Sequence, residues 1–406
     1  MDSTDLYHQI LGLNSNWQVS EVKLEMAAKK VEIFVKYVKT ILECPECGKA
    51  CPGYDKANER RWRHLDTCQM QTIIHSQLPR INCSEHGVKT IKCPWAEPHG
   101  RFTLFFEAIV INLMQACKNQ TRAANFLGIT FDQANAIMQR AVVRGLSRRD
   151  KNEIHEHLGV DEKSMKRKHT YITVLSNSET GAAIDVSEGR TIKATDDLYT
   201  KCLSKNQLFR IKTVTMDMWE SFYKATAKAI PQALIIHDRF HIAGYLTGMV
   251  DKTRISEVSK YSELKGQKYN LTRNIENLSQ SSHIKFTQAL KVAQKTAEAY
   301  VFKEAFREFF AVRNYKEAKT FLKKWCTRAY STGNRHVIKV SKMIRNHKNR
   351  ILNYIRSQRT NAMAENLNGR IQEVKFCARG FRRFLNFRNA ILFFCGQLDM
   401  NPLKTQ

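Results

Sequence analysis

Three carboxylic acids stand where they could converge on a phosphodiester. Asp161 and Asp217 each follow a β-like apolar run, and Glu365 lies on the small, polar face of a predicted helix. Carboxylates gathered at strand ends and on one helix can hold two divalent ions about 4 Å apart, and hard oxygen ligands favour Mg²⁺ or Mn²⁺. Such a site activates water or a 3′-hydroxyl for in-line displacement at phosphorus. Taken singly, each acid has the pattern of an ordinary surface or capping residue, so spacing alone leaves the triad open.

Two cysteine-containing pairs in the first hundred residues have the spacing of zinc ligands. Cys44 and Cys47 form a CxxC pair, and Cys83 and His86 form a CxxH pair, each followed by glycine. Each pair can hold one face of a tetrahedral ion, and zinc suits a set of sulfur and nitrogen ligands. A site with four protein ligands has no open position, so we expect a structural zinc. Three further cysteines could each displace one of these ligands: Cys51, Cys68 and Cys93.

The stretch of residues 119–141 has the pattern of two helices joined by a glycine turn. A short predicted helix stops at Gly128, and Thr130 can cap a second helix. This order is typical of a DNA-reading helix-turn-helix, although ordinary helical hairpins share it. The second helix carries side chains of types that contact bases or phosphates: Gln133, Asn135, Gln139 and Arg140.

An alternation of strand-like and helical segments positions the first two acids. Three β-like runs, at 158–162, 171–175 and 182–186, precede a predicted helix at about 191–204 and then a β-α-β step. This is the order of a ribonuclease-H-like core, in which the ends of the first and fourth strands can lie side by side. The predicted fold class is therefore α+β, a ribonuclease-H-like catalytic core interrupted by an all-α insertion, with N-terminal zinc-binding and helix-turn-helix modules.

The β-α-β step contains further residues of interest. Its helix carries an apolar stripe that begins at Trp219, and its second strand runs into Asp238 and His241. Asp238 competes with Asp217 for the place of second acid. We prefer Asp217, because the end of the fourth strand faces the end of the first strand.

The chain divides into zones of different composition. In residues 1–43, the stretch from Val22 to Ile41 has apolar residues at both helical and alternating spacings, and we assign an N-terminal helix to this zone. The predicted domains are an N-terminal helix and zinc-binding module (1–100), a helix-turn-helix module (101–150), the first part of the core (151–241), a basic α-helical insertion (242–355) and the C-terminal helices of the core (356–406).

The composition restricts the classes of protein to which the chain can belong. Of its 406 residues, 43% are hydrophobic, too many for a disordered chain. No apolar run approaches the roughly 18 residues needed to span a bilayer, and the first residues lack the pattern of a signal peptide. The odd number of cysteines, 11, fits a reducing compartment better than a disulfide framework. We therefore expect a cytoplasmic protein.

A net charge of +28 indicates a polyanionic partner, because Lys and Arg neutralise phosphates. The charge is uneven: residues 1–100 have a net charge of +1, residues 151–200 of −2 and residues 251–406 of +21. We therefore expect the helical insertion and the C-terminal region to bind most of the phosphates. After the Glu365 helix, arginines alternate with phenylalanines, which fits phosphate contact with packing or base stacking. These arginines are Arg379, Arg382, Arg383 and Arg388.

The motifs occur in an order that resembles one known family. The segments CPECGK, INCSEHG and CPWA are followed by GVDEKSMKRKHTY, VTMDMWESFY, IIHDRFH and TNAMAENLNGRIQEV. This series, from about residue 40 to 396, resembles the ISL-three family of bacterial insertion-sequence DDE transposases. The resemblance implies a ribonuclease-H-like enzyme with catalytic Mg²⁺ or Mn²⁺ and structural Zn²⁺. By motif, its acids are Asp161, Asp217 and Glu365.

The resemblance also implies partners and supporting residues. Asp238 and His241 match the family's DRFH motif and are expected to shape the active site. The partner would be double-stranded DNA, both the terminal inverted repeats of the element and the target, bound by a homo-oligomer in the bacterial cytoplasm near the nucleoid. Two other functions remain open: a non-catalytic DNA-binding regulator derived from a transposase, and a nuclease that cannot transfer strands.

Overall fold

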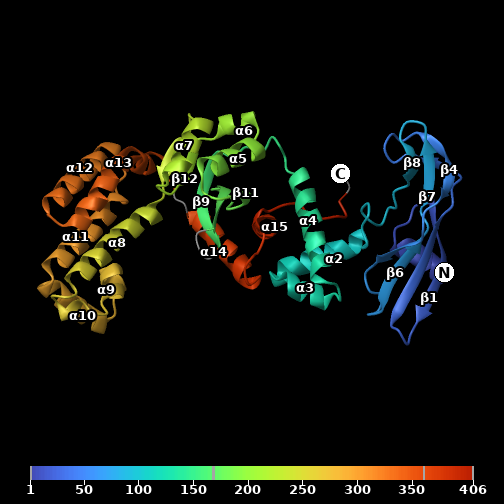
Figure 1. The fold of residues 1–406 in the computed structure, drawn as a ribbon, viewed down its shortest axis with the longest axis horizontal. Coiled ribbons are helices and arrows are strands. Elements are labelled where there is room, and N and C mark those ends of the chain that lie inside the picture. Colours follow the sequence, from blue (N-terminus) through green and yellow to red (C-terminus); the bar gives the residue numbers. More distant parts are fainter. Residues whose placement is uncertain (1, 167–169, 360–361, 405–406) are drawn as a thin grey trace. The chain divides into compact units, whose positions relative to one another are not determined.

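The protein is described by a computed structural model over residues 2–166, 170–359 and 362–404. The chain forms two compact units, Met1–Arg148 together with Leu398–Gln406, and Arg149–Gln397. Figure 1 shows the elements of each unit. Within the described ranges, no helix combines the length and the apolar character needed to cross a membrane.

The first unit begins with a short helix and two four-stranded sheets. α1 (Ser3–Ile10) is capped by Asp2, whose carboxylate accepts a hydrogen bond from the backbone N–H of Asp5. The strand order is β1-β2-β6-β5 in one sheet and β3-β4-β7-β8 in the other. The strands are β1 (Trp17–Glu25), β2 (Lys30–Tyr37), β3 (Ile41–Glu43), β4 (Ala50–Lys56), β5 (Arg60–Arg63), β6 (Gln71–Ser76), β7 (Pro79–Cys83) and β8 (Gly87–Thr90).

The stretch from Val22 to Ile41, whose apolar residues have both helical and alternating spacings, forms strands. β1 and β2 pair as an antiparallel hairpin, and β2 also pairs in parallel with β6. Along β2, Val31, Ile33 and Val35 are buried, whereas the residues between them are more exposed. The alternating spacing decided the structure here because every second side chain reaches the core. The helix of this zone lies earlier, at α1.

Three helices follow the two sheets in the first unit. They are α2 (Leu104–Cys117), α3 (Gln120–Phe126) and α4 (Phe131–Ser147). The turn between α3 and α4 contains Gly128 at a φ of +63°. The Thr130 hydroxyl accepts a hydrogen bond from the Gln133 N–H, and the Gln133 side chain accepts one from the Thr130 N–H. The predicted helix, glycine turn and capped second helix are confirmed by these local contacts.

The end of the described chain also belongs to the first unit. Arg144 of α4 donates a hydrogen bond to the Met400 carbonyl at 3.0 Å, and Arg148 donates one to the Asn401 carbonyl at 2.6 Å. No pattern in the sequence indicates this return, because the contacts join residues more than 250 positions apart.

A five-stranded sheet forms the centre of the second unit. Its strand order is β11-β10-β9-β12-β13, with antiparallel pairing from β11 to β9 and parallel pairing from β9 to β13. The first strand is predicted to end at its acidic residues, but it continues to Lys166. It continues because β10 pairs with it along its length. The elements are β9 (His157–Lys166), β10 (Thr170–Asn177), β11 (Ala183–Glu188), α5 (Ile192–Cys202), α6 (Lys205–Arg210), β12 (Thr213–Met216), α7 (Glu220–Ala229) and β13 (Leu234–His237).

Helices make up the rest of the second unit. Residues 239–357, here called the helical segment, contain helices and no strand. Phe306, Phe309 and Trp325 lie in its buried core. α13 also packs on β13, and α14 lies along β9 (Figure 1). The helices are α8 (Arg239–Glu257), α9 (Lys268–Thr272), α10 (Gln280–Val292), α11 (Gln294–Phe309), α12 (Tyr315–Ser331), α13 (Arg335–Ser357), α14 (Ala362–Cys377) and α15 (Phe384–Cys395), with short 3-10 helices at Ser262–Leu264 and Ile275–Asn277.

Candidate functional site

The parallel strands of the second unit align three acidic residues, which we call the acidic edge. Val160, Met216 and His237 occupy the same register position on β9, β12 and β13. Because these strands run in the same direction, the next residue on each emerges at the same level and on the same face. Those next residues are Asp161, Asp217 and Asp238.

His241 lies among these three carboxylates. Its Nδ1 is 3.4 Å from an oxygen of Asp217, and its Nε2 is 3.9 Å from an oxygen of Asp161 and 3.9 Å from one of Asp238. Asp238 is the N-cap of α8 and accepts a hydrogen bond from the Phe240 N–H at 3.0 Å. The cap starts the helix so that His241, in its first turn, points back to the acids. This geometry explains the spacing of the DRFH motif.

Two hydrogen bonds fasten α14, the helix that carries Glu365, along β9. The Asn368 side-chain amide donates to an oxygen of Asp161. In the last turn of α14, Lys375 donates a hydrogen bond to the Ser164 carbonyl at 2.7 Å. The structure therefore brings the third predicted acid toward the acidic edge, although it is more than 140 residues away in sequence from Asp217.

The acids influence one another electrostatically. Burial raises the pKa of Asp217, and the negative charges of Asp161 and Asp238 raise it further. Partial burial also raises the pKa of Glu365, and the charges of Asp238 and Asp161 add to this effect. The positive charge of a protonated His241 acts in the opposite direction on both groups. Closely spaced carboxylates with hard oxygen donors suit a divalent cation, which relieves their repulsion.

An arginine–aromatic cluster beside the acidic edge was missed by the sequence reasoning. Arg190 donates to Glu162 at 3.0 Å, and its guanidinium lies 4.1 Å from the ring centre of Tyr171 and 4.5 Å from that of Trp219. The prediction that the apolar stripe of α7 begins at Trp219 is wrong, because this helix begins at Glu220. Trp219 precedes the helix, its indole N–H donates to the Arg190 carbonyl at 2.9 Å, and it is 39% exposed. The available signal was a tryptophan two residues after Asp217.

A second missed contact joins α13 to the sheet. The His347 Nδ1 lies 3.1 Å from the His237 Nε2 and 3.2 Å from an Arg350 nitrogen, and the Arg350 guanidinium lies 3.3 Å from the ring centre of Tyr223. Burial lowers the pKa of His237 to about 3, so this imidazole is neutral. His237 directly precedes Asp238, so the contact ties the helical segment to the acidic edge. No local pattern links residues 110 positions apart.

Four side chains form a compact group of metal-binding types in the first unit. Their donor atoms all lie within 4.8 Å of one another, which holds for no other such group in the described ranges. Glycines at φ of +73° and +65°, Gly48 and Gly87, form the turns after the two pairs. The group consists of Cys44, Cys47, Cys83 and His86, the four predicted ligands.

The three spare cysteines lie outside this group. Cys51 is near enough to Cys83 to interact with it, and burial together with that contact raises the pKa of Cys51. The Cys51 thiol donates to the Lys49 carbonyl at 3.4 Å, and the Cys93 thiol donates to a carbonyl at 3.8 Å. Cys68 is exposed. The chemistry of the donor set, three thiols and one imidazole, fits zinc.

The residues predicted to contact DNA differ in their surroundings. Arg140 donates to Glu107, whose side chain is fully buried, and Arg388 donates to both oxygens of Asp185. Gln133 is occupied by the cap of α4. Residue type alone does not reveal these partners, because they come from distant parts of the chain. The other predicted contacts are partly or fully exposed: Asn135, Gln139, Arg379, Arg382 and Arg383.

Comparison with known proteins assigns three parts of the chain to families. The family model for the ISL3 transposase matches residues 158–391. The model for the zinc-finger of transposase IS204/IS1001/IS1096/IS1165 matches residues 43–86, and the model for the helix-turn-helix domain of transposase family ISL3 matches residues 91–142. The chain is 24% identical over 416 residues to the transposase for insertion sequence element IS1557 of Mycobacterium tuberculosis, covering 94% of this chain and 93% of the relative. It is 21% identical over 367 residues to the transposase for insertion sequence element IS1001 of Bordetella parapertussis, covering 88% and 90%.

Proposed function

Because the chain belongs to the ISL3 family of insertion-sequence transposases, we propose that it binds the terminal inverted repeats of its element and catalyses metal-dependent cleavage and strand transfer. The observation that carries the proposal is the pairing of β9 with β12, which sets Asp161 beside Asp217. The helix of Glu365 is fastened to the same place through Asn368. We assign these three acids as the catalytic DDE triad.

We assign the second unit to the ribonuclease-H-like fold. The strand order, with three antiparallel strands followed by two parallel ones, supports this assignment. The catalytic core would then comprise residues 151–241 and 356–397, with residues 242–355 as an α-helical insertion between its two parts, whereas residues 398–406, predicted to be part of the core, belong to the first unit. Residues 1–100 and 101–150 would form the zinc-binding and helix-turn-helix modules.

Asp161, Asp217 and Glu365 are the proposed ligands of Mg²⁺ or Mn²⁺. Two such ions, when bound, activate water or a 3′-hydroxyl and stabilise the leaving oxygen. The residues around the triad prepare it: Asn368 orients the carboxylate of Asp161, and His241 faces the acids from α8. Each of these contacts restricts the positions that the carboxylates can take before substrate binds.

We propose Asp217, and not Asp238, as the second acid. Asp238 already has a structural role, because it caps α8 and its carboxylate accepts a hydrogen bond from the Phe240 N–H. It also lies on the outer strand, whereas β12 is adjacent to β9. Asp238 and His241 therefore take supporting positions, which shape the active site.

The first unit is proposed to recognise the ends of the element. Cys44, Cys47, Cys83 and His86 would hold the structural zinc, whose binding energy stabilises a region of short strands. In the helix-turn-helix, Asn135 and Gln139 on α4 are the side chains proposed to reach base edges. Transposition joins two ends of one element, so we propose that the protein acts as a homo-oligomer.

A strand-joining assay tests the catalytic proposal. The full-length protein is incubated with labelled terminal-repeat DNA, target DNA and Mg²⁺. We expect joined product with the wild type, and unimpaired DNA binding without joining for Asp217→Asn. Joining that survives in Asp217→Asn and is lost in Asp238→Asn would overturn the choice of second acid. Wild-type binding without any cleavage would indicate a non-catalytic regulator, and cleavage without joining a nuclease.

A further inference from the structure

The positive charge of the helical segment is concentrated on α12 and α13. Together these helices carry 12 Lys and Arg residues and one acidic residue, Glu317. The preceding part of the segment, residues 239–309, carries 12 basic and seven acidic residues, and some of these form ion pairs, such as Arg254 with Asp251 and Arg307 with Glu276. Most of the surplus of positive charge in the helical segment therefore comes from its last two helices.

On α13 the exposed basic side chains form a stripe. Arg335, Lys339 and Lys342 follow one another at intervals of four and three residues, which keeps them on one side of a helix. Asn346 and Asn349 continue the same line and are also exposed. The opposite side of α13 is buried in the core of the helical segment. The stripe thus has a fixed direction relative to the core. We call it the α13 stripe.

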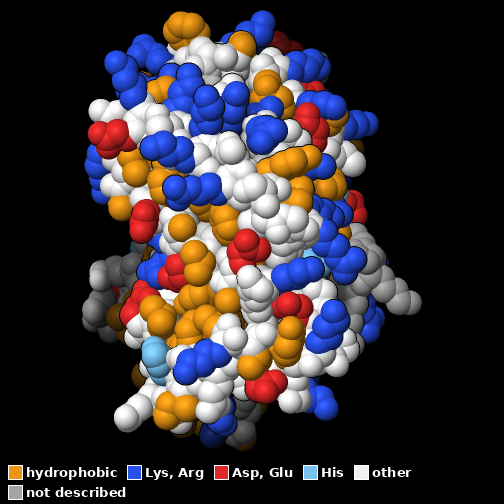
Figure 2. Space-filling view, turned by 90° about the vertical axis from the view of Figure 1, so that its left-hand side faces the viewer, with side chains coloured by type: hydrophobic (Ala, Val, Ile, Leu, Met, Phe, Trp, Pro, Cys, Tyr) orange, Lys and Arg blue, Asp and Glu red, His pale blue; other side chains and the backbone are white. Residues whose placement is uncertain are grey.

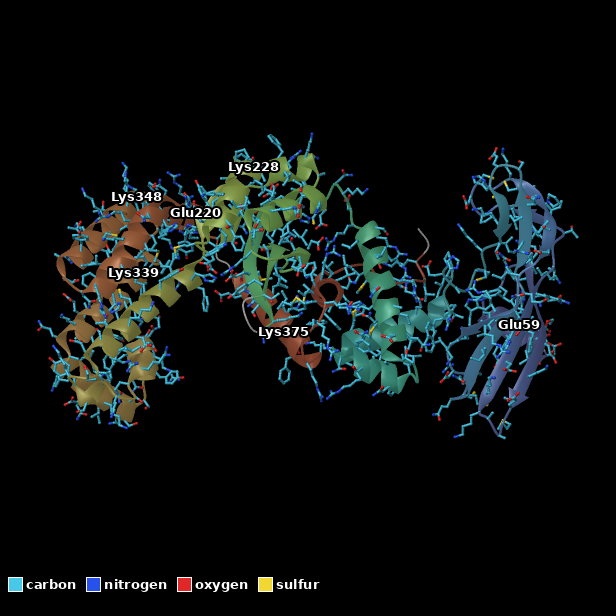
Figure 3. All side chains as sticks on the ribbon, in the orientation of Figure 1. Glu59, Glu220, Lys228, Lys339, Lys348 and Lys375 are labelled. Atoms are coloured by element: carbon cyan, nitrogen blue, oxygen red, sulfur yellow. The ribbon has the colours of Figure 1, made fainter. Side chains whose placement is uncertain are left out.

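The basic side chains of α12 and α13 have no ion-pair partner among the described residues. Figure 2 shows Lys and Arg side chains gathered over the upper part of the face on which these helices lie, with few acidic ones between them. Figure 3 labels Lys339 and Lys348 on α13. Charges of one sign that lie this close repel one another, and a polyanion relieves the repulsion.

The α13 stripe leads away from the acidic edge. Near the edge, His347 contacts His237 of β13, and Asn353 donates to the Ile235 carbonyl at 2.8 Å. From His347 back to Arg335 the helix covers about 18 Å at 1.5 Å per residue. This length corresponds to about five base pairs of duplex DNA at roughly 3.4 Å each.

We propose that the exposed faces of α12 and α13 bind the phosphate backbone of duplex DNA beside the reacting phosphodiester, without reading its sequence. The proposal rests on the proposed function for the position of the reacting bond. Duplex DNA is favoured over RNA or an acidic protein because the same chain contains a DNA-binding helix-turn-helix. Lys, Arg and Asn side chains are among those that contact phosphate oxygens, and such contacts carry no sequence information. The proposal thus assigns part of the chain's positive charge to a defined DNA-binding surface on α12 and α13.

The test uses the full-length protein and two variants with the same change in charge. The first combines Arg335→Ala, Lys339→Ala and Lys342→Ala in the α13 stripe. The control replaces three exposed lysines of the preceding helices with alanine: Lys285, Lys291 and Lys295. Affinity for a labelled duplex of mixed sequence without terminal repeats is measured by fluorescence anisotropy at a series of salt concentrations. Thermal melting by circular dichroism verifies that both variants are folded.

We expect the α13 variant to bind at least tenfold more weakly at moderate salt. The slope of log affinity against log salt should fall by about 2 to 3, since each lost phosphate contact removes roughly 0.9. The control variant should keep most of the wild-type slope. Equal slopes for the α13 variant and the wild type, or an equal loss in the control, would overturn the proposal. So would a loss of RNA binding that exceeds the loss of duplex binding.

The same proteins distinguish this proposal from the catalytic one. If the wild type fails to join strands, the catalytic proposal fails, whereas the comparison of slopes on plain duplex still decides whether the α13 stripe binds DNA. If the wild type joins strands and the slopes do not differ, the surface proposal alone fails.

Discussion

Replacing Asn368 with alanine removes the hydrogen bond that joins α14 to Asp161. Asp161 is only 7% exposed, so water cannot fully replace the lost donor. A hydrogen bond to a charged group contributes about 1.5 to 3 kcal/mol. If this energy is lost from the transition state, strand joining slows by about 10- to 150-fold, because each 1.36 kcal/mol corresponds to a factor of ten. Removing the partner of a metal ligand has effects of roughly this size in other metal sites.

The assay is the initial rate of strand joining at increasing Mg²⁺, together with DNA affinity and thermal stability. We expect the Asn368→Ala variant to need more Mg²⁺ and to join more slowly, with DNA affinity unchanged. Asn366→Ala is the matched control, because Asn366 is an exposed residue of the same helix. A rate within twofold of the wild type for Asn368→Ala, or an equal decrease for Asn366→Ala, would show that the bond does not position Asp161.

Three further predictions concern the first unit. Cys47→Ser, or a zinc chelator, should release zinc and lower the melting temperature and terminal-repeat affinity, whereas Cys68→Ser, at an exposed cysteine, should leave all three unchanged. Glu107→Gln should lower the free energy of unfolding by about 3 to 5 kcal/mol in urea titrations, because two arginines lose a buried partner, whereas Asp132→Asn at an exposed carboxylate should change it little. Burial lowers the pKa of His64 to about 4. Between pH 6.5 and 4, His64 is therefore protonated in the unfolded state but neutral in the folded state. Stability should therefore be complete above pH 6.5 and fall by up to about 3 kcal/mol toward pH 4, and a His64→Gln variant that shows the same fall would contradict this cause.

Features that depend only on residues close together in the sequence were predictable. The two pairs of metal-binding residues, the glycine turn with its capping threonine, and the order of strands and helices around Asp161 and Asp217 each depend on neighbouring residues. The register of parallel strands then follows from the strand order, because strands that run side by side end at the same edge. The places of Asp161 and Asp217 could therefore be expected before the structure was known, although the continuation of β9 beyond Asp161 could not.

Features that depend on distant residues were not predictable from spacing. The stretch from Val22 to Ile41 showed two periodicities, and pairing with β6 decided for the strand. Arg140 and Arg388 are predicted to contact DNA, and only the structure shows that they also pair with Glu107 and Asp185. The sequence by itself determined the residue types for a zinc group, an acidic site and a basic surface, since composition and spacing are local properties. Only the tertiary structure decided which charges have partners and which remain available to a ligand, because that depends on what the folded chain brings together.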